Sequence, residues 1–396
     1  MNFRHFYSLF ACLTFTTFFA CTEPPAESNE LIVQSGEATQ LDSEIGAIAQ
    51  EFLEWVEDYQ ETDEIPGVAV ALVKGDEIIL LEGLGDRDVE QGLPVTPDTL
   101  FHIGSTHKSM TALLMATLVD DGIVDWDTPA IAIDPAFILE TAASTKTVTL
   151  RHLLSMRSGI PDDAEDGFAI ESEAEDLFDY VAEVELLGTP GEVFSYSNLS
   201  ASLAGYLAVL AMESAGKPVA GNSLYEKYGQ LLGDRLLTPI GMTRSTILDS
   251  RARADSNHSR SYTYEGGELQ ESDPDDIDGD ALAPSGSLKA SITDMARYIL
   301  TQVNNGVDPN GDRLVSEENL QETWQPRWGN YALGWEVNQI QGVQVISHEG
   351  SYDNYLSVIG IIPTYDVGFV ILSNADDAAE ALITDTPDKL VEMLGN

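Results

Sequence analysis

The chain has 396 residues, of which 43% are hydrophobic, and this length and composition suit one large or two modest globular domains. Acidic residues outnumber basic ones by 67 to 19, and the formal net charge is −48. A field of this sign repels phosphate groups, so it excludes a nucleic-acid-binding surface and electrostatic attraction to anionic lipid. We expect a solvated acidic surface suited to a salty environment, where dissolved ions screen the mutual repulsion.

The first twenty residues have the pattern of a secretory signal peptide. Arg4 and His5 lie near the start, an apolar stretch runs over residues 6–20, and no acidic residue occurs before Glu23. The apolar stretch is too short for a stable membrane-spanning helix. We therefore expect the signal to cover residues 1–20 and the protein to be exported to the periplasm or cell surface.

The residues that follow the signal are similar to the lipidation site of bacterial lipoproteins, because the small Ala20 directly precedes Cys21. We expect Cys21 to carry a lipid anchor in a bacterial membrane, and the polar residues 21–43 to form a flexible tether. Ordinary cleavage near this point is the alternative. The other cysteine, Cys12, lies inside the signal, so we expect a mature chain without an intramolecular disulfide.

The order of the expected elements indicates an α+β domain over residues 44–396. Apolar positions at helical spacing begin at Ile45, and two β-rich runs separated by a Lys-Gly-Asp turn at 74–76 predict an antiparallel hairpin. A mostly helical middle follows over about 141–280, and strand patterns return near the C-terminus. These elements predict one antiparallel sheet built from both termini, flanked by helices, with an inserted helical subdomain.

The segment "EGGELQESDPDDIDGD", residues 265–280, predicts a solvated acidic loop. Its Asp276, Asp278 and Asp280 alternate as calcium ligands do, but no glutamate closes a twelve-residue loop in the register that an EF-hand requires. We therefore expect no metal here and no cofactor elsewhere in the chain.

The stretch "FHIGSTHKSM", residues 101–110, places Ser105 and Lys108 three residues apart at the start of an apolar helix. Residues at this spacing are neighbours on a helix surface, so the lysine can reach the serine hydroxyl. The start of a helix also presents free N–H groups and a partial positive charge. Both features suit acyl transfer, although the four-residue pattern alone is common in unrelated chains.

Two further stretches strengthen this interpretation. "PGEVFSYSNLS" contains Tyr196 and Asn198, and "VISHEGSYDNY" contains His348 and Gly350 at the end of an expected strand. The ordered motifs S-x-x-K, Y-x-N and basic residue-x-Gly resemble those of the penicillin-recognising serine hydrolases, which include class C β-lactamases, D-Ala-D-Ala carboxypeptidases, esterases and D-aminopeptidases. The segments "LLTPIGMTRST", "APSGSLKASITDMARY" and "YALGW" resemble the same family. The resemblance implies a β-lactamase-like fold.

The resemblance also implies catalytic roles. Ser105 is expected to be the nucleophile, with Lys108 as the base, and which of Lys108 and Tyr196 first accepts the proton stays open. Tyr196 is expected to return the proton to the leaving group. Asn198 is expected to offer its amide to the substrate or to fix Lys108.

The strand motif supplies the remaining expected site residues. His348 stands where many relatives carry lysine, so we expect it to assist Tyr196 in a pH-sensitive way. Gly350 and Ser351 line the substrate site, and the N–H groups of Ser105 and Ser351 are expected to form the oxyanion hole. Glu349 departs from the family, because relatives usually have a threonine there that binds a substrate carboxylate. Its anion disfavours such substrates, unless strand alternation turns the side chain away from the cleft.

The sequence thus predicts a serine hydrolase that cleaves ester or amide bonds in a small-molecule or peptide-like substrate, most simply an esterase or peptidase. A D-Ala-D-Ala carboxypeptidase with weak β-lactamase activity is the alternative within the enzyme class. A non-catalytic cell-surface binding protein is the alternative outside it, and the intact serine, lysine and tyrosine motifs argue against this. The sequence leaves the oligomeric state open.

Overall fold

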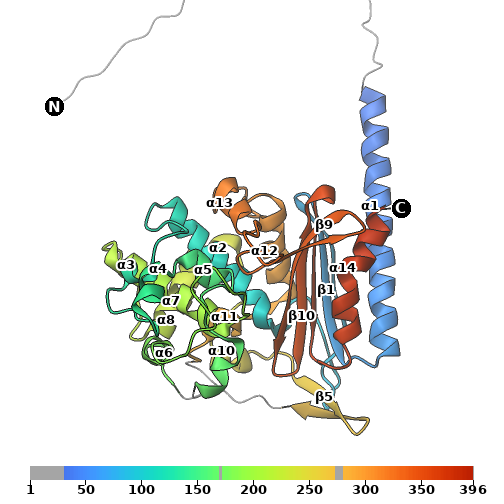
Figure 1. Ribbon diagram of the computed structural model, residues 1–396. Helices are drawn as coiled ribbons and strands as arrows, with labels where there is room; N and C mark the ends of the chain where they lie inside the picture. The colour runs from blue at the N-terminus through green and yellow to red at the C-terminus, as the bar shows by residue number, and fades with distance from the viewer. Residues whose placement is uncertain (1–30, 169–171, 273–279, 396) are drawn as a thin grey trace, which may run out of the picture. The chain divides into compact units, whose positions relative to one another are not determined.

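The computed structural model describes residues 31–168, 172–272 and 280–395 (Figure 1). The expected signal peptide, Cys21, and the aspartates Asp276 and Asp278 lie outside these residues. The chain divides into two compact units, Met1–Glu44 and Ile45–Asn396. The second unit contains every element that positions the candidate site, and the description below concerns that unit.

Helix α1 spans Leu31–Thr62, so it begins earlier than the expected start at Ile45 and includes part of the expected tether. This span contains no proline, so the backbone can continue as a helix through the polar residues that precede Ile45. Across the described ranges, no helix combines the length and the hydrophobicity that crossing a bilayer requires.

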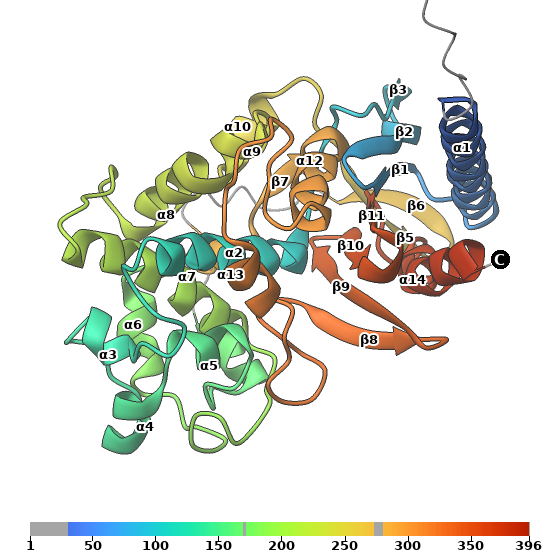
Figure 2. The same cartoon turned by 90° about the horizontal axis from the view of Figure 1, so that it is seen from above.

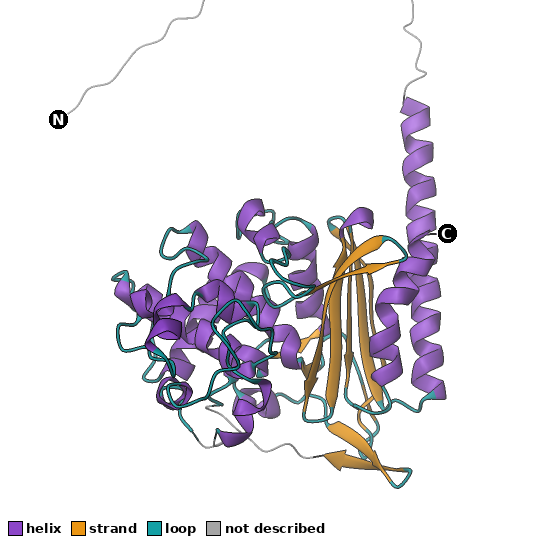
Figure 3. Ribbon diagram, viewed as in Figure 1, coloured by secondary structure: helices purple, strands orange, loops and turns teal. Residues whose placement is uncertain are grey.

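A seven-stranded antiparallel sheet, built from both ends of the second unit, forms its centre among the described residues (Figure 3). The N-terminal hairpin pairs with the C-terminal strand through β1 and β11, in a register that places Val70 opposite Ile371. This confirms the predicted fold class. The strands, in spatial order, are β3 (Leu93–Pro94), β2 (Glu77–Asp88), β1 (Gly67–Lys74), β11 (Val367–Ser373), β10 (Tyr355–Ile362), β9 (Val343–Tyr352) and β8 (Glu336–Ile340).

Helices cover both faces of this sheet, as Figure 2 shows from above. The part of α1 that follows Ile45 packs with α14 (Glu380–Gly395) on one face, and α2 (His107–Asp120) and α12 (Ile292–Val303) lie on the other. Successive side chains of a strand point to opposite faces, so the sequence of a strand covered on both sides is a continuous apolar run. The buried run of β1 therefore divides its alternate residues between two hydrophobic cores.

The remaining helices form a mostly helical region beside the sheet. Two small two-stranded sheets also occur among the described residues, β4–β7 and β5–β6, and the β5–β6 hairpin lies at one end of the main sheet (Figure 1). The β5–β6 hairpin replaces the first part of the expected acidic loop, because its residues alternate around a Gly-Gly turn. The elements are β4 (Leu100–His102), α3 (Ala130–Ile133), α4 (Ala142–Thr147), α5 (Leu150–Leu154), α6 (Asp176–Val181), α7 (Asn198–Ser214), α8 (Leu224–Leu232), α9 (Thr238–Ile240), α10 (Asp249–Ala254), β5 (Ser261–Glu265), β6 (Glu268–Ser272), α11 (Ala283–Gly286), β7 (Lys289–Ser291) and α13 (Glu317–Glu322).

Candidate active site

Ser105 lies in a tight turn between strand β4 and helix α2. The turn is a short 3₁₀ helix, Gly104–Thr106, which runs directly into α2 at His107. Gly104 has a positive φ of 51°, and a Cβ atom there would lie 2.6 Å from the backbone nitrogen of Ser351. Only glycine fits such a conformation at so close an approach. The turn therefore holds Ser105 at the start of α2, directly against strand β9.

Lys108 is almost fully buried one helical turn beyond Ser105. Its Nζ donates hydrogen bonds to Ser105 Oγ at 2.8 Å and to the carbonyl oxygen of Ser285 at 2.9 Å. Burial lowers the pKa of Lys108 to about 7, and the nearby carboxylates of Glu165 and Asp162 partly oppose this shift. A substantial fraction of this amine is therefore neutral near pH 7.

Tyr196 approaches the same serine from the segment before α7. Its hydroxyl interacts with the side chain of Ser105, and Lys108 Nζ lies 4.8 Å from the centre of its ring. Burial raises the pKa of Tyr196 well above its usual range, so its phenol keeps its proton at neutral pH. The expected nucleophile, base and acid thus lie in mutual contact.

Asn198 is the first residue of α7, and Ser197 before it caps the helix by accepting a bond from the Ser200 N–H. The Asn198 Oδ1 atom is buried without a hydrogen-bond partner among the described residues. Lys108 Nζ is hydrogen-bonded to Ser105 and Ser285, so the structure favours a substrate-facing amide at Asn198 over one that fixes the lysine. Asn198 and Ser105 line a cavity of about 330 Å³.

Strand β9 presents the expected oxyanion-hole residue. Asp353 and Asn354, both with positive φ, make a two-residue turn that closes the β9–β10 hairpin at the Tyr352–Tyr355 pair. Because backbone groups alternate in direction along a strand, the N–H of Ser351 faces away from β10, toward Gly104. The pairing of β8 with β9 ends at Ser347, which leaves this edge of β9 open to the cleft.

Gly350 makes the approach of β9 to the nucleophile possible. A Cβ atom at Gly350 would collide with the carbonyl oxygen of Ile103 and lie 3.1 Å from the backbone nitrogen of Ser105. The glycine of the expected strand motif is therefore required by contact between the two backbones rather than by contact with substrate. The two N–H groups expected to hold an oxyanion lie on these two contacting segments.

His348 is buried beside Tyr196, with ring centres 6.1 Å apart. Burial and the neighbouring Lys108 lower the pKa of His348 to about 4, so the ring is neutral at neutral pH. Its Nε2 atom lies 3.0 Å from the hydroxyl of Tyr331, a residue of the "YALGW" segment. The sequence of that segment indicated only a family resemblance, and the hydrogen bond shows that Tyr331 contacts the candidate site.

Glu349 is exposed, whereas His348 and Gly350 on either side of it are buried. Strand alternation therefore puts its side chain on the face that α14 covers, away from the side that contacts Ser105. The neighbouring protein atoms partly desolvate the carboxylate even though the residue is exposed, and this desolvation, followed by repulsion from Glu336 and Glu380, raises the pKa of Glu349. The cavity of about 540 Å³ that begins at Ser105 continues over this edge of the sheet to these three carboxylates.

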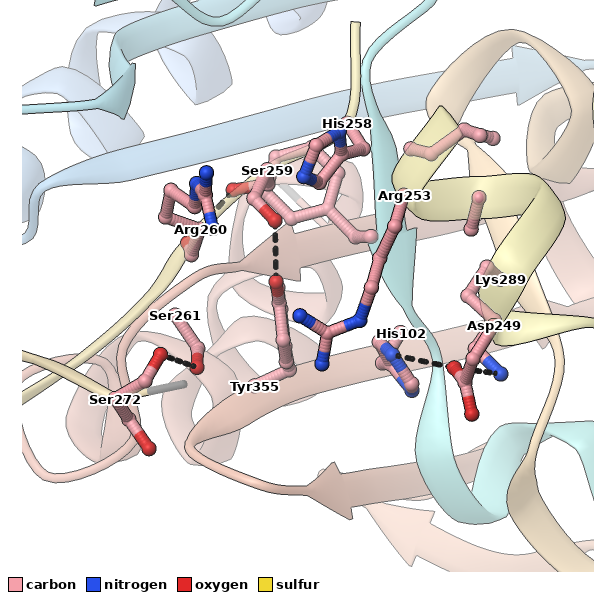
Figure 4. A pocket seen from close by; sticks show the side chains of 13 residues that line it. His102, Asp249, Arg253, His258, Ser259, Arg260, Ser261, Ser272, Lys289 and Tyr355 are labelled. Atoms are coloured by element: carbon pink, nitrogen blue, oxygen red, sulfur yellow. Dashed lines mark hydrogen bonds and ion pairs between the residues drawn. The ribbon is translucent and has the colours of Figure 1, made fainter. Parts of the chain in front are cut away.

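A second polar cluster lies behind the nucleophile turn (Figure 4). Buried Lys289 and Asp249 form an ion pair, and His102 Nε2 lies 3.5 Å from Asp249 Oδ1. The His102 ring stacks on Tyr352 and Tyr355, with ring centres 4.5 and 5.1 Å away. Removing one member of a buried ion pair is strongly destabilising. The ion pair therefore connects α10 with β7, and the His102 stacking connects β4 with the end of β9 that carries Ser351.

A family model, "Beta-lactamase", matches residues 52–391. The chain belongs to the beta-lactamase family. This confirms the resemblance inferred from the three ordered motifs, and the match covers nearly the whole second unit of this beta-lactamase-family protein.

The curated relatives of this beta-lactamase-family protein are distant and longer. "Protein flp" of Staphylococcus aureus (strain MW2) is 27% identical over 314 residues, which cover 78% of this chain and 60% of the relative. "Unguisins hydrolase ungD'" of Aspergillus campestris (strain IBT 28561) is 27% identical over 367 residues, covering 87% of this chain and 66% of the relative. The chain thus spans roughly three fifths to two thirds of the length of these relatives.

Solved structures show the same fold. The octameric penicillin-binding protein homologue from Pyrococcus abyssi superposes with a TM-score of 0.72 at 24% identity, covering 88% of this chain and 77% of the homologue. The crystal structure of SurE gives a TM-score of 0.69 at 22% identity, covering 89% of this chain and 74% of that one. At this level of identity the likeness concerns the fold alone.

Proposed function

We propose that this beta-lactamase-family protein hydrolyses ester or amide bonds through an acyl-enzyme on Ser105. The observation that carries the proposal is the buried amine of Lys108, 2.8 Å from Ser105 Oγ, with a pKa of about 7. A neutral amine at this distance can accept the hydroxyl proton as the oxygen attacks. Tyr196, whose pKa is raised, starts with its proton in place, which suits it for the acid rather than the first base.

The steps follow from these protonation states. Ser105 Oγ bonds to the carbonyl carbon while its proton passes to Lys108, and the N–H groups of Ser105 and Ser351 hold the oxyanion. The bond to the leaving group then breaks as Tyr196 gives it a proton, and Lys108 returns a proton to Tyr196. Water attacks the acyl-enzyme by the same route in reverse, and the serine regains its hydroxyl proton.

The charges around Ser105 support a substrate without a free carboxylate. The residues that line the two cavities at Ser105 include eight carboxylates and, among the described residues, no lysine or arginine. An anionic substrate would be repelled on both sides of the nucleophile. Neutral esters, amides and amine-bearing substrates fit this field, and the name of the Aspergillus relative supports hydrolysis as the class of reaction. These carboxylates belong to Glu165, Asp280, Glu336, Glu349, Asp353, Asp376, Asp377 and Glu380.

Covalent labelling and a substrate panel test this proposal. Wild type and Ser105→Ala are treated with a fluorophosphonate probe, and the labelled peptide is identified by mass spectrometry. Both are then assayed on short-chain p-nitrophenyl esters, D-amino-acid amides, nitrocefin and a D-Ala-D-Ala peptide. We expect labelling at Ser105 and turnover of esters or amides by the wild type alone. Preference for nitrocefin or the D-Ala-D-Ala peptide would favour the carboxypeptidase instead, and absence of both labelling and turnover would favour a binding protein.

A further inference from the structure

Both nitrogens of the His348 ring are occupied by hydrogen bonds. Nδ1 bonds to the carbonyl oxygen of Glu349, and a carbonyl oxygen only accepts, so Nδ1 carries the proton. In the neutral ring Nε2 is then the acceptor. The hydroxyl of Tyr331, 3.0 Å away, must therefore be the donor to Nε2. These two bonds select a single tautomer, with the proton on Nδ1.

We propose that Tyr331 is a positioning residue that holds His348 as a neutral ring in this one tautomer beside Tyr196. Held in this way, His348 neither takes up charge near neutral pH nor competes for the protons of Ser105 and Tyr196. Its part in the site differs from that of the lysine that relatives carry at this position, since it contributes shape and a fixed dipole rather than a cation. The catalytic part of this inference rests on the proposed function, whereas the tautomer does not.

The surroundings of Tyr331 suit this role. The residue is 3% exposed, and its ring packs against Phe194, edge-on against Tyr196 and edge-on against His348, at centre distances of 5.6, 6.1 and 5.7 Å. It therefore joins the segment before α7 to strand β9. A buried hydroxyl without a hydrogen-bond partner is unfavourable, so the bond to His348 is the stable state of this side chain.

Some of the groups around the His348 ring disfavour its protonated form, and others favour it. Lys108 of α2 disfavours a protonated His348, and Tyr196 packs beside it. Glu336, at the start of β8, lines the same cavity and would favour a cation. Because a donor to Nε2 stabilises the neutral form, removing the Tyr331 hydroxyl should raise the pKa of His348 and release the choice of tautomer.

Nitrogen-15 NMR of the histidine rings gives a direct test. The chain has six histidines, and the signals of His348 are assigned by their loss in His348→Gln. In the wild type we expect a protonated Nδ1 and a bare Nε2 throughout pH 6 to 8. Tyr331→Phe should lose this single tautomer and titrate at higher pH than the wild type. A wild-type ring that is cationic, or protonated on Nε2, overturns the proposal without any variant.

Tyr298→Phe is the matched control, because Tyr298 is also buried and also donates its hydroxyl proton to one side chain, Ser109. It should leave the signals of His348 unchanged. An unaltered tautomer and pKa in Tyr331→Phe would overturn the proposal, as would an equal change in Tyr298→Phe.

Kinetics of the full-length variants test the catalytic part. We expect kcat on the best ester to fall about tenfold in Tyr331→Phe, with KM within about twofold, which corresponds to the loss of one buried hydrogen bond. His348→Gln combined with Tyr331→Phe should be no worse than the worse single variant, since both act through one bond. Additive losses would contradict the pairing. A wild type without ester or amide turnover would refute the proposed function, whereas the NMR result would still decide the tautomer.

Discussion

Lys108 and Ser285 are joined by a hydrogen bond of 2.9 Å from the buried amine of the lysine to the backbone carbonyl oxygen of Ser285 in α11. This second bond fixes the amine beside Ser105 in the absence of substrate. The lysine is thus placed by an element distant in sequence as well as by the helix that carries it.

Ser105→Ala should abolish turnover and covalent labelling. Removing the attacking oxygen should lower kcat/KM by about 10³-fold or more, while the helix start and the Lys108–Ser285 bond remain. The measurements are ester hydrolysis, probe labelling and the melting temperature. Residual activity above a tenth of the wild-type value, with an unchanged melting temperature, would sink the assignment of the nucleophile.

The pH dependence of kcat/KM should report the titration of Lys108. Only the neutral amine accepts a proton, so activity should rise with pH through about 7. The Glu165 carboxylate raises the lysine pKa, so Glu165→Gln should move this rise to lower pH. Asp163→Asn, an exposed change in the same short helix, is the control. A shift to higher pH in Glu165→Gln would contradict the electrostatic account.

Lys108→Met should inactivate the enzyme and change the pH dependence of its stability. The lysine pKa is 10.5 in its ordinary state and about 7 when folded, so the unfolded chain binds more protons between these values. The free energy of unfolding of the wild type therefore increases as the pH rises from about 7 toward 10.5. The methionine variant lacks this gain, so its stability relative to wild type should fall from pH 7 to pH 9. Urea unfolding at several pH values measures this difference in stability. Lys146 is exposed, so Lys146→Met should show no such trend.

Salt should stabilise the protein, because it screens the repulsion among the surface carboxylates of the folded state. The net charge is −48, and the Debye length falls to about 3 Å at 1 M salt. The melting temperature should rise steadily from dilute buffer to about 1 M sodium chloride. Potassium chloride should give the same curve, because screening depends on ionic strength rather than on the cation. A melting temperature that stays constant or falls with salt would show that repulsion among the acidic residues does not significantly destabilise the folded state.

Glu349→Thr tests whether the acidic end of the cleft selects against carboxylates. Removing one of three neighbouring anions should improve a carboxylate-bearing substrate relative to a neutral ester. Because Glu349 lies on the α14 side, away from the side that contacts Ser105, we expect a gain of a few fold to about tenfold in the ratio of kcat/KM values. Glu268→Gln, on the exposed β5–β6 hairpin, should leave the ratio unchanged. A ratio within about twofold of wild type would show that Glu349 does not select substrates.

The proximity of Ser105 to Lys108 and a sheet built from both termini could be predicted because each leaves a local pattern. Ser105 and Lys108 are one helical turn apart, and the terminal strands are continuous apolar runs that only a sheet covered on both faces requires. Tyr331 and Ser285 could not be placed in this way. Their roles depend on bonds to residues 17 and 177 positions away, and spacing in the sequence carries no record of such contacts.

The neutral state of His348 was likewise beyond sequence reasoning. A histidine at the end of a strand has an ordinary pKa until burial and a neighbouring lysine are known. Local alternation, by contrast, allowed the outward position of Glu349 to be foreseen as one of two possibilities. The β5–β6 hairpin was not predicted. Its Gly-Gly turn and alternating residues are typical of a hairpin, but the acidic composition of the segment is typical of a solvated loop.

The pairing of β1 with β11 has a consequence for how the chain is made. Val68 of the first hairpin pairs with Ser373, so the hairpin leaves the ribosome with an unpaired edge that stays open until β11, about 300 residues later in the chain, has been synthesised. The contact between Gly104 and Ser351 likewise waits for the last strands. A nascent or truncated chain that ends before β9 therefore carries Ser105 and Lys108 without the strand that contacts them, and we expect such a chain to lack the proposed activity.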